Sequence, residues 1–465
     1  MIQTATSVAV NFSTIKSGVQ MNSVDRELDS IINNEALAYA IYTVENRAIP
    51  NLMDGFKPVQ RFMVYRALEM AKGNHQKFHK LASVAGGVAD AGYHHGENSA
   101  QEAGALMANT WNNNFPFLDG QGNFGSRLVQ EAAASRYIFC RISDNFRKVF
   151  KDIEIAPQHE DEEHLPPKHY LPVIPTVLLN GVRGIATGYS TSILPHSLES
   201  VIECTRLALQ GKLDKEPEVA FPQFNGNIVK TEDGKYELQG VYKFTSKTQM
   251  YISEIPYSFD RAKYVEKVLD PLEDKGFITY DDDCSKHGFG FKVKFRKDYK
   301  LPEDEGLMHE KIMRDFKLTE KAPQYIVVID ENGKLNDKFE NASDLIKYFV
   351  EVRKKYVKGR IEFMINKTER QFKLAIAKAM FIKTVNNGET VIKGKKKSEL
   401  KEELSKISVF QGFEDQLLAM NLYHLTDDEV VRLREAAHAA KTELDYWKET
   451  TVQIEYEKDL DELSK

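Results

Sequence analysis

The spacing of apolar residues predicts helices in the first third of the chain. A helical arm is expected at residues 25–48, where apolar side chains recur at roughly helical spacing. These positions are Ile31, Ile32, Leu37, Ile41 and Val44. Further short helices are predicted between loops rich in glycine and asparagine, at residues 59–70, 99–110 and 129–137. Short, closely spaced helices of this kind indicate a small helical DNA-binding module, and residues 157–175, rich in proline, histidine and acids, are expected to form a connector.

From Phe221 onwards the pattern becomes that of a separate α/β domain. Strict alternation or apolar runs predict strands, and one stretch between them has helical period. The predicted strands are residues 250–255, 277–280 and 289–295, and the predicted helix is 260–272. The domain is expected to end near residues 328–337, where the sequence ENGK at 331–334 is typical of a hairpin turn.

The last third is predicted to be a pair of long helices. The first has an apolar seam with alternating spacings of four and three, at Leu345, Phe349, Val352, Tyr356, Gly359 and Phe363. Thr426 and Glu429 form a capping box that opens the second helix. Its seam is Val430, Leu433, Ala437, Ala440, Leu444 and Trp447. The two helices are expected to form an antiparallel coiled-coil arm, with the basic residues 393–397 as a solvated turn at its tip.

Composition restricts the class of protein. A chain of 465 residues with 42% apolar residues has room for two to four domains with proper cores. No apolar run is long enough to span a bilayer, and the first twenty or so residues lack the features of a signal peptide. The three cysteines, Cys140, Cys204 and Cys284, are far apart, so free thiols in a reducing compartment are expected. We therefore expect a cytoplasmic protein.

The net charge of -6 does not by itself indicate a nucleic-acid partner. The charge is segregated, however: residues 41–150 hold twelve lysines and arginines against nine acids, together with four of the twelve histidines. This distribution favours a local phosphate-contacting face on an otherwise acidic protein.

Tyr137 carries the strongest chemical signal, because Arg136 precedes it and a glycine-rich loop at residues 119–127 lies just upstream. A phenol oxygen can attack a phosphodiester while a guanidinium holds the phosphate, and the resulting ester keeps the bond energy so that the break can be resealed. A phenol in water ionises near pH ~10, so attack at neutral pH needs a base or a nearby positive charge. An arbitrary Arg-Tyr pair on a buried helix face would only pack, but the surrounding motifs favour the nucleophile.

Several motifs are better explained without a cofactor. Gly120, Gly122 and Gly125 match the spacing of a dinucleotide fingerprint, but a polar, proline-containing loop precedes them instead of a strand. No GxxxxGK[ST] phosphate loop is present, so hydrolysis of a nucleotide by this chain alone is not expected. Adjacent His94 and His95 lack further ligands at metal spacing and are expected to contact phosphate or sugar, and Asp281–Asp283 is expected to be a solvated turn.

Three cations bracket glycine and proline turns near the start of the chain. They are Arg47, Lys57 and Arg61. As a set they are predicted to contact phosphates, which position a duplex without reading its sequence.

Six segments, in this order along the chain, resemble motifs of the breakage-reunion subunit of type IIA DNA topoisomerases. They are NRAIP at 46–50, DGFKPVQR at 54–61, YHHGE at 93–97, DGQGNFGS at 119–126, SRY at 135–137 and PTVLLNGVRGIATG at 175–188. The resemblance covers about residues 25–465. Gln60 and Phe62 depart from the gyrase pattern and are given no role, and a gyrase-type DNA-wrapping tail is not found, which argues against active supercoiling.

The resemblance implies an α+β multidomain fold. It would comprise an N-terminal tail (residues 1–24), a winged-helix DNA-cleavage domain with the N-terminal arm (25–165), an α/β tower domain (166–340), and an antiparallel coiled coil with a dimerising C-gate (341–465). A helix carrying the scissile tyrosine is expected to follow residues 135–137.

The resemblance also implies a mechanism. Tyr137 would attack a backbone phosphorus to give a transient 5′-phosphotyrosyl double-strand break through which a second duplex passes, and Arg136 would stabilise the charge on the phosphoryl oxygens. Arg47, Lys57, Arg61, His94 and His95 would position the strand. Ile185 resembles a side chain that wedges between base pairs.

One tyrosine cuts one strand, so the resemblance implies a homodimer on double-stranded DNA. Mg²⁺ and ATP would be bound by a partner ATPase/TOPRIM subunit, with no metal on this chain. Two other classes of protein stay open. A non-enzymatic architectural DNA-binding protein could keep the fold without cleavage, and a tyrosine recombinase would leave the tower and coiled-coil segments unexplained.

Overall fold

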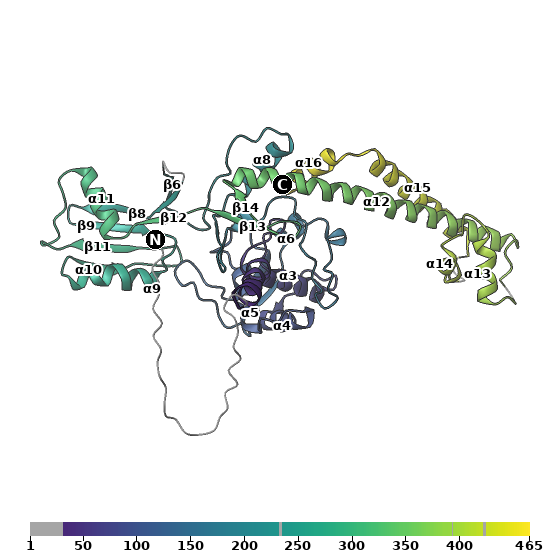
Figure 1. Ribbon diagram of the computed structural model, residues 1–465, viewed down its shortest axis with the longest axis horizontal. Helices are drawn as coiled ribbons and strands as arrows, with labels where there is room; N and C mark the ends of the chain where they lie inside the picture. Colours follow the sequence, from purple (N-terminus) through teal and green to yellow (C-terminus); the bar gives the residue numbers. More distant parts are fainter. Residues whose placement is uncertain (1–30, 232–234, 393, 422–424) are drawn as a thin grey trace, which may run out of the picture.

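The computed structural model describes residues 31–231, 235–392, 394–421 and 425–465. A central body carries a sheet-containing extension at one end and a long helical arm at the other (Figure 1). The expected tail at residues 1–24 lies outside the described residues. Among those described, no helix is both long enough and apolar enough to cross a bilayer.

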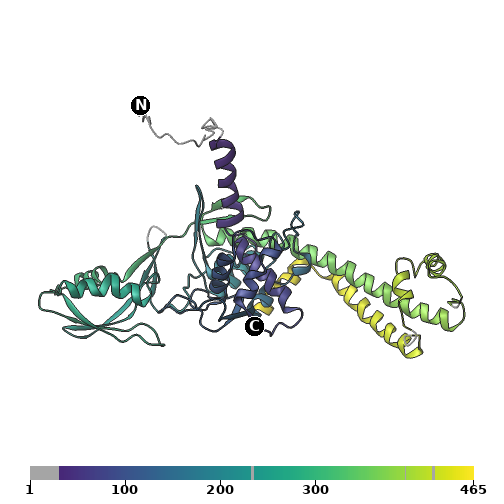
Figure 2. The same cartoon turned by 90° about the horizontal axis from the view of Figure 1, so that it is seen from below.

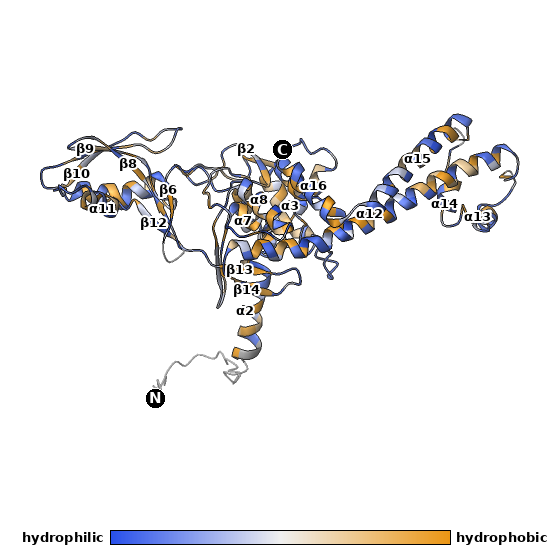
Figure 3. Ribbon diagram, turned by 90° about the horizontal axis from the view of Figure 1, so that it is seen from above, coloured by the Kyte–Doolittle hydropathy of each residue, from blue (hydrophilic) through white to orange (hydrophobic). Residues whose placement is uncertain are grey.

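The N-terminal helix stands away from the body (Figure 2). It runs through η1 (Ile31–Ala36), α2 (Leu37–Thr43) and η2 (Val44–Ala48), which confirms the predicted arm over residues 31–48. Figure 3 colours much of it as hydrophobic, and several large side chains are exposed to solvent, including Leu37, Tyr39 and Ile41. Its last turn rejoins the body, where Val44 and Ile49 pack against the strand residues Val327 and Ile329.

The body begins with three α-helices and a short 3-10 helix packed around a small sheet. Pro58 starts α3, where its fixed φ and missing N–H fit the first helical turn. The helices are α3 (Pro58–Ala71), α4 (Leu81–Gly86), η3 (Ala89–Ala91) and α5 (Glu97–Ala108). The sheet has the order β1 (His79–Lys80), β3 (Phe139–Ile142), β2 (Leu118–Gln121), all antiparallel. The helices predicted at residues 59–70 and 99–110 are therefore confirmed within a few residues.

The chain then builds the second half of the body. Residues 157–175 have no regular structure apart from one bridge pairing, between Pro172 and Phe150, as expected of a connector, although Tyr170, Val173 and Ile174 are buried. The elements of this half are α6 (Asp144–Val149), η4 (Ile153–Ile155), α7 (Val177–Asn180), the hairpin β4 (Val182–Ile185) and β5 (Ser190–Ile193), and α8 (Leu198–Leu209).

The sheet extension, residues 241–318, has its own core. Its sheet has the order β10 (Ile278–Asp282), β11 (Phe291–Phe295), β9 (Gln249–Glu254), β8 (Val241–Ser246). In β11 the alternating side chains Phe291, Val293 and Phe295 are buried against its helices. These helices are α9 (Arg261–Tyr264), η5 (Val265–Leu269), α10 (Asp270–Asp274) and α11 (Glu305–Asp315). The predicted strands and the predicted helix in this region are confirmed.

Two smaller β-structures connect the extension to the body. A three-stranded sheet has the order β12 (Thr319–Ala322), β7 (Tyr236–Gln239), β6 (Asn227–Lys230), and shares a core with Leu194 and Phe221. The predicted hairpin is formed by β13 (Ile326–Ile329) and β14 (Leu335–Phe339), with Gly333 at φ +80° in its turn.

The coiled-coil arm is formed by α12 (Ala342–Asn386) and α15 (Asp427–Glu449), with α13 (Lys397–Ser405) and α14 (Glu414–Leu418) at its tip. Thr426 caps α15 by accepting a hydrogen bond from the Glu429 N–H, as predicted. In the arm, Ala379 and Ile382 of α12 pack with Val430 and Leu433 of α15. Lys393, in the predicted basic turn, lies outside the described residues.

The predicted seam of α12 has a different partner from the one expected. Leu345, Phe349 and Val352 are fully or almost fully buried, but they belong to the core of the body and not to the coiled coil. The spacing of four and three identifies a packed helix face and does not specify what packs on it. α12 is thus a body helix for its first turns and an arm helix afterwards.

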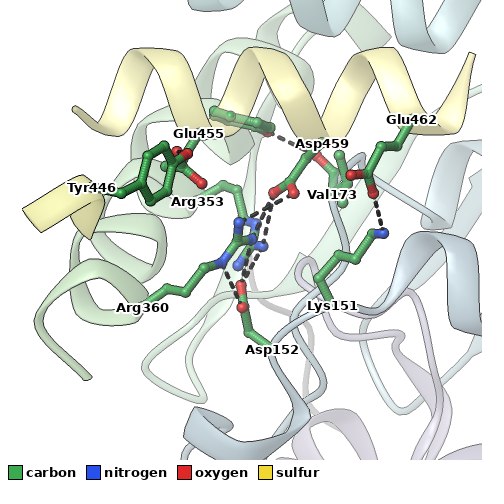
Figure 4. Close-up of polar contacts among 10 residues, drawn as sticks. Lys151, Asp152, Val173, Arg353, Arg360, Tyr446, Glu455, Asp459 and Glu462 are labelled. Carbon is green, nitrogen blue, oxygen red and sulfur yellow. Dashed lines mark hydrogen bonds and ion pairs between the residues drawn. The ribbon is translucent and has the colours of Figure 1, made fainter. Parts of the chain in front are cut away.

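A further helix, α16 (Val452–Leu463), was not predicted and returns from the arm to the body. Figure 4 shows the ion cluster that fastens it. Arg360 donates to both oxygens of Asp152, with Nε–Oδ1 at 2.6 Å, and to both oxygens of Asp459 on α16. Arg353, which has no exposed surface, also donates to Asp152. Nearby, the Tyr456 hydroxyl donates to the Val173 carbonyl at 2.8 Å.

The hydrophobic cores do not follow the predicted domain boundaries at residues 165 and 340. One continuous core joins residues 52–213, 326–357 and 456–463, whereas the extension has a core of residues 250–318. The named domains therefore stay predictions.

Candidate nucleic-acid interface

Tyr137 lies in a turn and not on a helix. The prediction of a helix at residues 129–137 is wrong, and so is the expectation of a helix after Tyr137, because β3 begins at Phe139. The backbone of this alanine-rich segment is hydrogen-bonded to other loops: Ala133 N–H donates to Asn123 O at 2.9 Å, and Leu81 N–H donates to Ile138 O at 3.0 Å. These contacts hold the chain on both sides of Tyr137.

The Tyr137 ring is presented to solvent. Its side chain is 66% exposed, whereas the next residue, Ile138, is buried in the core of the body. The guanidinium carbon of Arg136 lies 4.7 Å from the centroid of the Tyr137 ring. Among the residues that the structure describes, the contact of the Arg136 guanidinium is with this ring, and no ion pair joins it to a carboxylate.

The glycine-rich loop before Tyr137 is a tight turn and not a dinucleotide site. The expectation that no strand precedes the glycines is wrong, because β2 runs from Leu118 to Gln121. An irregular segment nevertheless follows where a fingerprint would require a helix, so the motif is rejected on that ground. Gly125 has φ +82°, and a Cβ there would lie 2.7 Å from the Gln130 carbonyl oxygen. Glycine is needed at this position because the loop folds back on itself.

Arg127 joins this loop to the sheet extension. Its guanidinium carbon lies 4.6 Å from the ring centroid of Tyr257 and 5.2 Å from that of Phe289. Its Nη2 donates to Glu254 Oε1 at 3.2 Å, and both side chains are buried. The loop that leads to Tyr137 is therefore anchored in the extension at one end and in the body at the other.

Arg61 is not placed to contact a nucleic acid. It is buried, and its Nε and Nη2 donate to the two oxygens of buried Asp54 at 2.7 and 3.0 Å. Asp54 also accepts from the backbone N–H groups of Phe56 and Tyr170. We therefore remove Arg61 from the predicted phosphate contacts, because its charge is neutralised inside the fold and holds this turn together.

Lys57 and Arg47 lie at the two ends of the turn that Arg61 supports. Lys57 is part-buried, burial lowers the pKa of its ammonium, and its Nζ donates to the carbonyl of Arg183 at 2.8 Å. Arg47 is in the last turn of the N-terminal helix. Gly184 of strand β4 packs against the last turn of this helix, since a Cβ on Gly184 would lie 2.2 Å from the carbonyl oxygen of Ala48. Both cations are thus next to the β4–β5 hairpin.

Ile185 ends strand β4 at the tip of that hairpin. It is 87% exposed, the highest exposure among the large apolar side chains of the described residues. The tip is closed by the Ala186 N–H, which donates to Tyr189 O at 2.8 Å. A large aliphatic side chain on a rigid two-stranded support has the geometry expected of a wedge.

His94 and His95 are exposed on the loop before α5. Burial of its ring, followed by the charges of Arg47 and His94, lowers the pKa of His95 below its usual 6.5, so His95 is neutral at physiological pH. Its Nε2 lies 2.7 Å from the hydroxyl of Tyr42 on α2. Nothing in the spacing of the sequence indicated this contact between residues 53 positions apart.

A cavity of about 690 Å³ opens beside His95, between the N-terminal helix and residues 157–169. Imidazole and aromatic side chains line much of it: Tyr42, Tyr93, His95, His159, His164 and His169. Burial lowers the pKa of His164 and of His169 to about 4, so both rings are neutral at physiological pH. His169 is buried, whereas His164 is half-buried and stacks on the ring of His159. Sequence reasoning missed these two histidines, because only the fold brings the connector against this cavity.

The described residues contain no group of three or more His, Cys, Asp or Glu side chains that could hold a metal ion. The aspartate triplet considered above is not a turn, because Asp281 and Asp282 are the last residues of β10. Asp282 and Asp283 pair with Arg261 and Lys292 respectively.

Comparisons with known proteins agree with one another. A family model that describes the A subunit of DNA gyrase/topoisomerase IV matches residues 47–461. The chain is 63% identical over 445 residues to the DNA topoisomerase medium subunit of Enterobacteria phage T4, covering 96% of this chain and 100% of that protein. It is 29% identical over 501 residues to DNA topoisomerase 2 of Plasmodium falciparum, covering 96% of this chain but 35% of that protein.

One solved structure supports the same assignment. The topoisomerase II DNA-binding, cleavage and re-ligation domain of Plasmodium falciparum matches with a TM-score of 0.83 and 28% identity, over 93% of this chain and 63% of that one. The overall α+β architecture is therefore shared.

Proposed function

The chain belongs to the family of DNA gyrase/topoisomerase IV A subunits and is the DNA-cleaving and religating subunit of a type II topoisomerase, and from this premise we propose that Tyr137 is its nucleophile. The observation that carries the proposal is the exposed Tyr137 ring beside Arg136, on a loop held at both ends. Nothing in the described residues favours a non-enzymatic architectural protein.

In the proposed step the Tyr137 oxygen forms a bond to a backbone phosphorus as its phenol proton leaves. The bond from phosphorus to the 3′ oxygen breaks, and that oxygen takes up a proton to become a 3′-hydroxyl. The 5′ end is then esterified to Tyr137. Attack by the 3′-hydroxyl reverses the step, so resealing needs no external source of energy.

Arg136 is proposed to stabilise the charge that gathers on the phosphoryl oxygens, since a fixed cation is most effective where charge develops. Arg47, Lys57, His94 and His95 are proposed to hold the neighbouring phosphates and so fix the register of the duplex.

Ile185 is proposed to wedge between base pairs. Such insertion costs a few kcal/mol of stacking and permits a bend that brings more protein against the duplex. The exposure of this side chain at a hairpin tip supports the role.

The holoenzyme of this family uses ATP and Mg²⁺ and acts on DNA with partner subunits. We propose that both cofactors are bound by a partner ATPase/TOPRIM subunit, as the resemblance of this chain to the breakage-reunion subunit implies. Two copies of the chain would supply the two tyrosines of a double-strand break. We propose that the tip of the coiled-coil arm is the C-gate of this homodimer, with residues 25–165 as the winged-helix domain and 166–340 as the tower.

The proposed nucleophile is tested with Tyr137→Phe in the reconstituted holoenzyme. DNA cleavage and relaxation are expected to fall below detection, while affinity for uncleaved DNA changes less than about twofold, since only one hydroxyl is removed. Tyr325→Phe is the matched control, because Tyr325 is an exposed tyrosine that uses only backbone groups in the described hydrogen bonds. Normal cleavage by the Tyr137 variant would refute the proposal.

A further inference from the structure

His95 is held between two tyrosines from different parts of the chain. On one side the Tyr42 hydroxyl lies 2.7 Å from Nε2, with ring centroids 6.0 Å apart. On the other side the Tyr93 ring meets His95 edge to face, with centroids 5.4 Å apart, and the Tyr93 hydroxyl is fixed by Ser99 Oγ at 2.8 Å. Tyr93 belongs to the same loop as His95, whereas Tyr42 belongs to the N-terminal helix.

A hydrogen bond to one ring nitrogen decides what the other can do. A neutral imidazole has one donor nitrogen and one acceptor nitrogen, and the partner of the first selects the tautomer. When the Tyr42 hydroxyl donates to Nε2, the proton of the ring resides on Nδ1. That N–H is then the donor that His95 can offer to a phosphate oxygen.

We propose that Tyr42 is a positioning residue of the cleavage site, which fixes the tautomer and orientation of His95 through its hydroxyl. The inference rests on the proposed contact between His95 and the cleaved strand. It adds that the N-terminal helix takes part in the reaction through a side chain that acts on His95. A ring fixed in advance loses less conformational freedom when the strand binds, which favours the reacting geometry.

The charged and titratable groups around His95 come from several elements. Arg47 of the N-terminal helix and His94 of the same loop act on it directly. The same cavity is lined by further titratable or charged groups: Glu45, Arg61, His159, Asp161, Glu163, His164, Lys168, His169 and Glu331. None of these is altered by removing the Tyr42 hydroxyl, so a change confined to that hydroxyl reports on the single bond to Nε2.

The test compares Tyr42→Phe with Tyr39→Phe. Both residues are on α2 and exposed, 41% and 60% respectively, but the Tyr39 hydroxyl makes no hydrogen bond within the described residues. The first readout is the rate of DNA cleavage by the holoenzyme against pH. The second is the pKa of His95, followed by NMR on protein labelled at histidine Cε1 and assigned with His95→Asn.

Tyr42→Phe is expected to slow cleavage at neutral pH by roughly 3- to 10-fold, the loss that one hydrogen bond accounts for. Because the lost bond favoured the neutral ring, the pKa of His95 should rise, and the acid limb of the pH profile should shift to higher pH with it. Tyr39→Phe should match the wild-type protein in both readouts, and thermal melting should be the same for all three.

Two results would overturn the inference: Tyr42→Phe indistinguishable from Tyr39→Phe, or a shift in the His95 pKa with no change in cleavage. Tyr137→Phe in the same assay separates this from the proposed function. Cleavage by that variant would refute the nucleophile, whereas its inactivity beside an unaffected Tyr42→Phe would refute only the role of Tyr42.

Discussion

The two extensions leave the body in opposite directions, and arginines fasten both of them, but in different surroundings (Figure 1). At the sheet extension Arg127 lies among aromatic rings and meets one carboxylate, Glu254. At the coiled-coil arm, Arg353 and Arg360 share two aspartates. We call these two attachments the sheet joint and the coiled-coil joint. The sheet joint is formed mainly by packing of Arg127 against aromatic rings, and the coiled-coil joint is a cluster of four charged side chains.

The two joints should therefore respond differently to the loss of one member. Without Arg127, Glu254 would still accept from the backbone N–H groups of Ile255 and Asn225, both at 3.0 Å. Asp152 has no such substitute, because its described side-chain partners are the two arginines. Removing one charge from a buried cluster leaves the other charges without a partner, and this strongly lowers the free energy of unfolding.

The largest effect is expected from Asp152→Ala. The loss of its carboxylate leaves Arg353 and Arg360 buried with only Asp459, which should destabilise the joint by about 3–5 kcal/mol. Hydrogen exchange followed by mass spectrometry should show faster exchange in α16 and in the first half of α12, with β9 and β11 unchanged.

The control for this variant is Glu462→Ala, which removes the exposed pair between Lys151 and Glu462 at 2.7 Å (Figure 4). An exposed pair contributes no more than about 0.5–1 kcal/mol. Equal protection of α16 in the two variants would mean that the cluster does not fasten the arm.

A smaller effect, about 2 kcal/mol, is expected from Arg127→Met, which keeps the apolar stem but loses the ion pair and the contacts with the rings. Exchange should rise at β9 and not at α16. Cleavage should also slow, because the loop from Arg127 carries Tyr137. Arg261→Met is the matched control, since Arg261 makes an exposed pair with Asp282 in the same extension. Faster exchange in α16 instead would show that the joints are not independent.

The smallest effect is expected from lowering the pH, which should reduce the stability of the coiled-coil joint. Burial alone would raise the pKa of the Asp152 carboxyl, but Arg353 and Arg360 outweigh burial and hold it below the ordinary value. When the pKa of an aspartate is lower in the folded state than in the unfolded state, its charge stabilises the fold. This contribution is complete when the pH is above the unfolded-state pKa of about 3.9, and it is lost as the pH falls through the folded-state pKa.

Protection of α16, corrected for the intrinsic exchange rate, should therefore be constant from neutral pH to about pH 5 and fall only below about pH 4. Asp152→Asn should weaken this dependence, and the remainder should come from Glu455 and Glu462 on α16, whose pKa values their partners also hold below the ordinary value. A loss of protection centred near neutral pH would contradict the assignment to Asp152.

Local patterns predicted local structure well. Alternation at residues 289–295 identified β11, and Thr426 with Glu429 identified the start of α15, since both signals act within a few residues. Alanine-rich residues 129–137 misled the prediction, because their backbone groups bond to loops distant in sequence. Helix propensity is a weak prior where tertiary hydrogen bonds compete.

The site was predicted in part for the same reason. Motif spacing selected Tyr137, Arg136 and Ile185 as candidates, whose roles stay predictions, and the structure leaves Tyr137 and Ile185 strongly exposed. It could not indicate that Asp54 neutralises Arg61, or that Tyr42 meets His95, because both contacts depend on how separate segments are packed. A charged residue beside a turn is the same in sequence whether it faces solvent or a buried carboxylate.

The two helical segments of the coiled-coil arm differ in continuity: α12 is one helix, whereas the returning segment is divided into α15 and α16. α12 is an unbroken rod of 45 residues, roughly 65–70 Å long at 1.5 Å per residue. The returning leg has a knee at Thr450 and Thr451, whose extended backbone separates α15 from α16. If the tip of the arm moves within the plane that contains α12 and α15, the path along one helix must become shorter than the path along the other. The continuous helix α12 cannot change its length. Such a movement must therefore change the backbone angles at Thr450 and Thr451, which lie next to the charge cluster that holds α16 on the body.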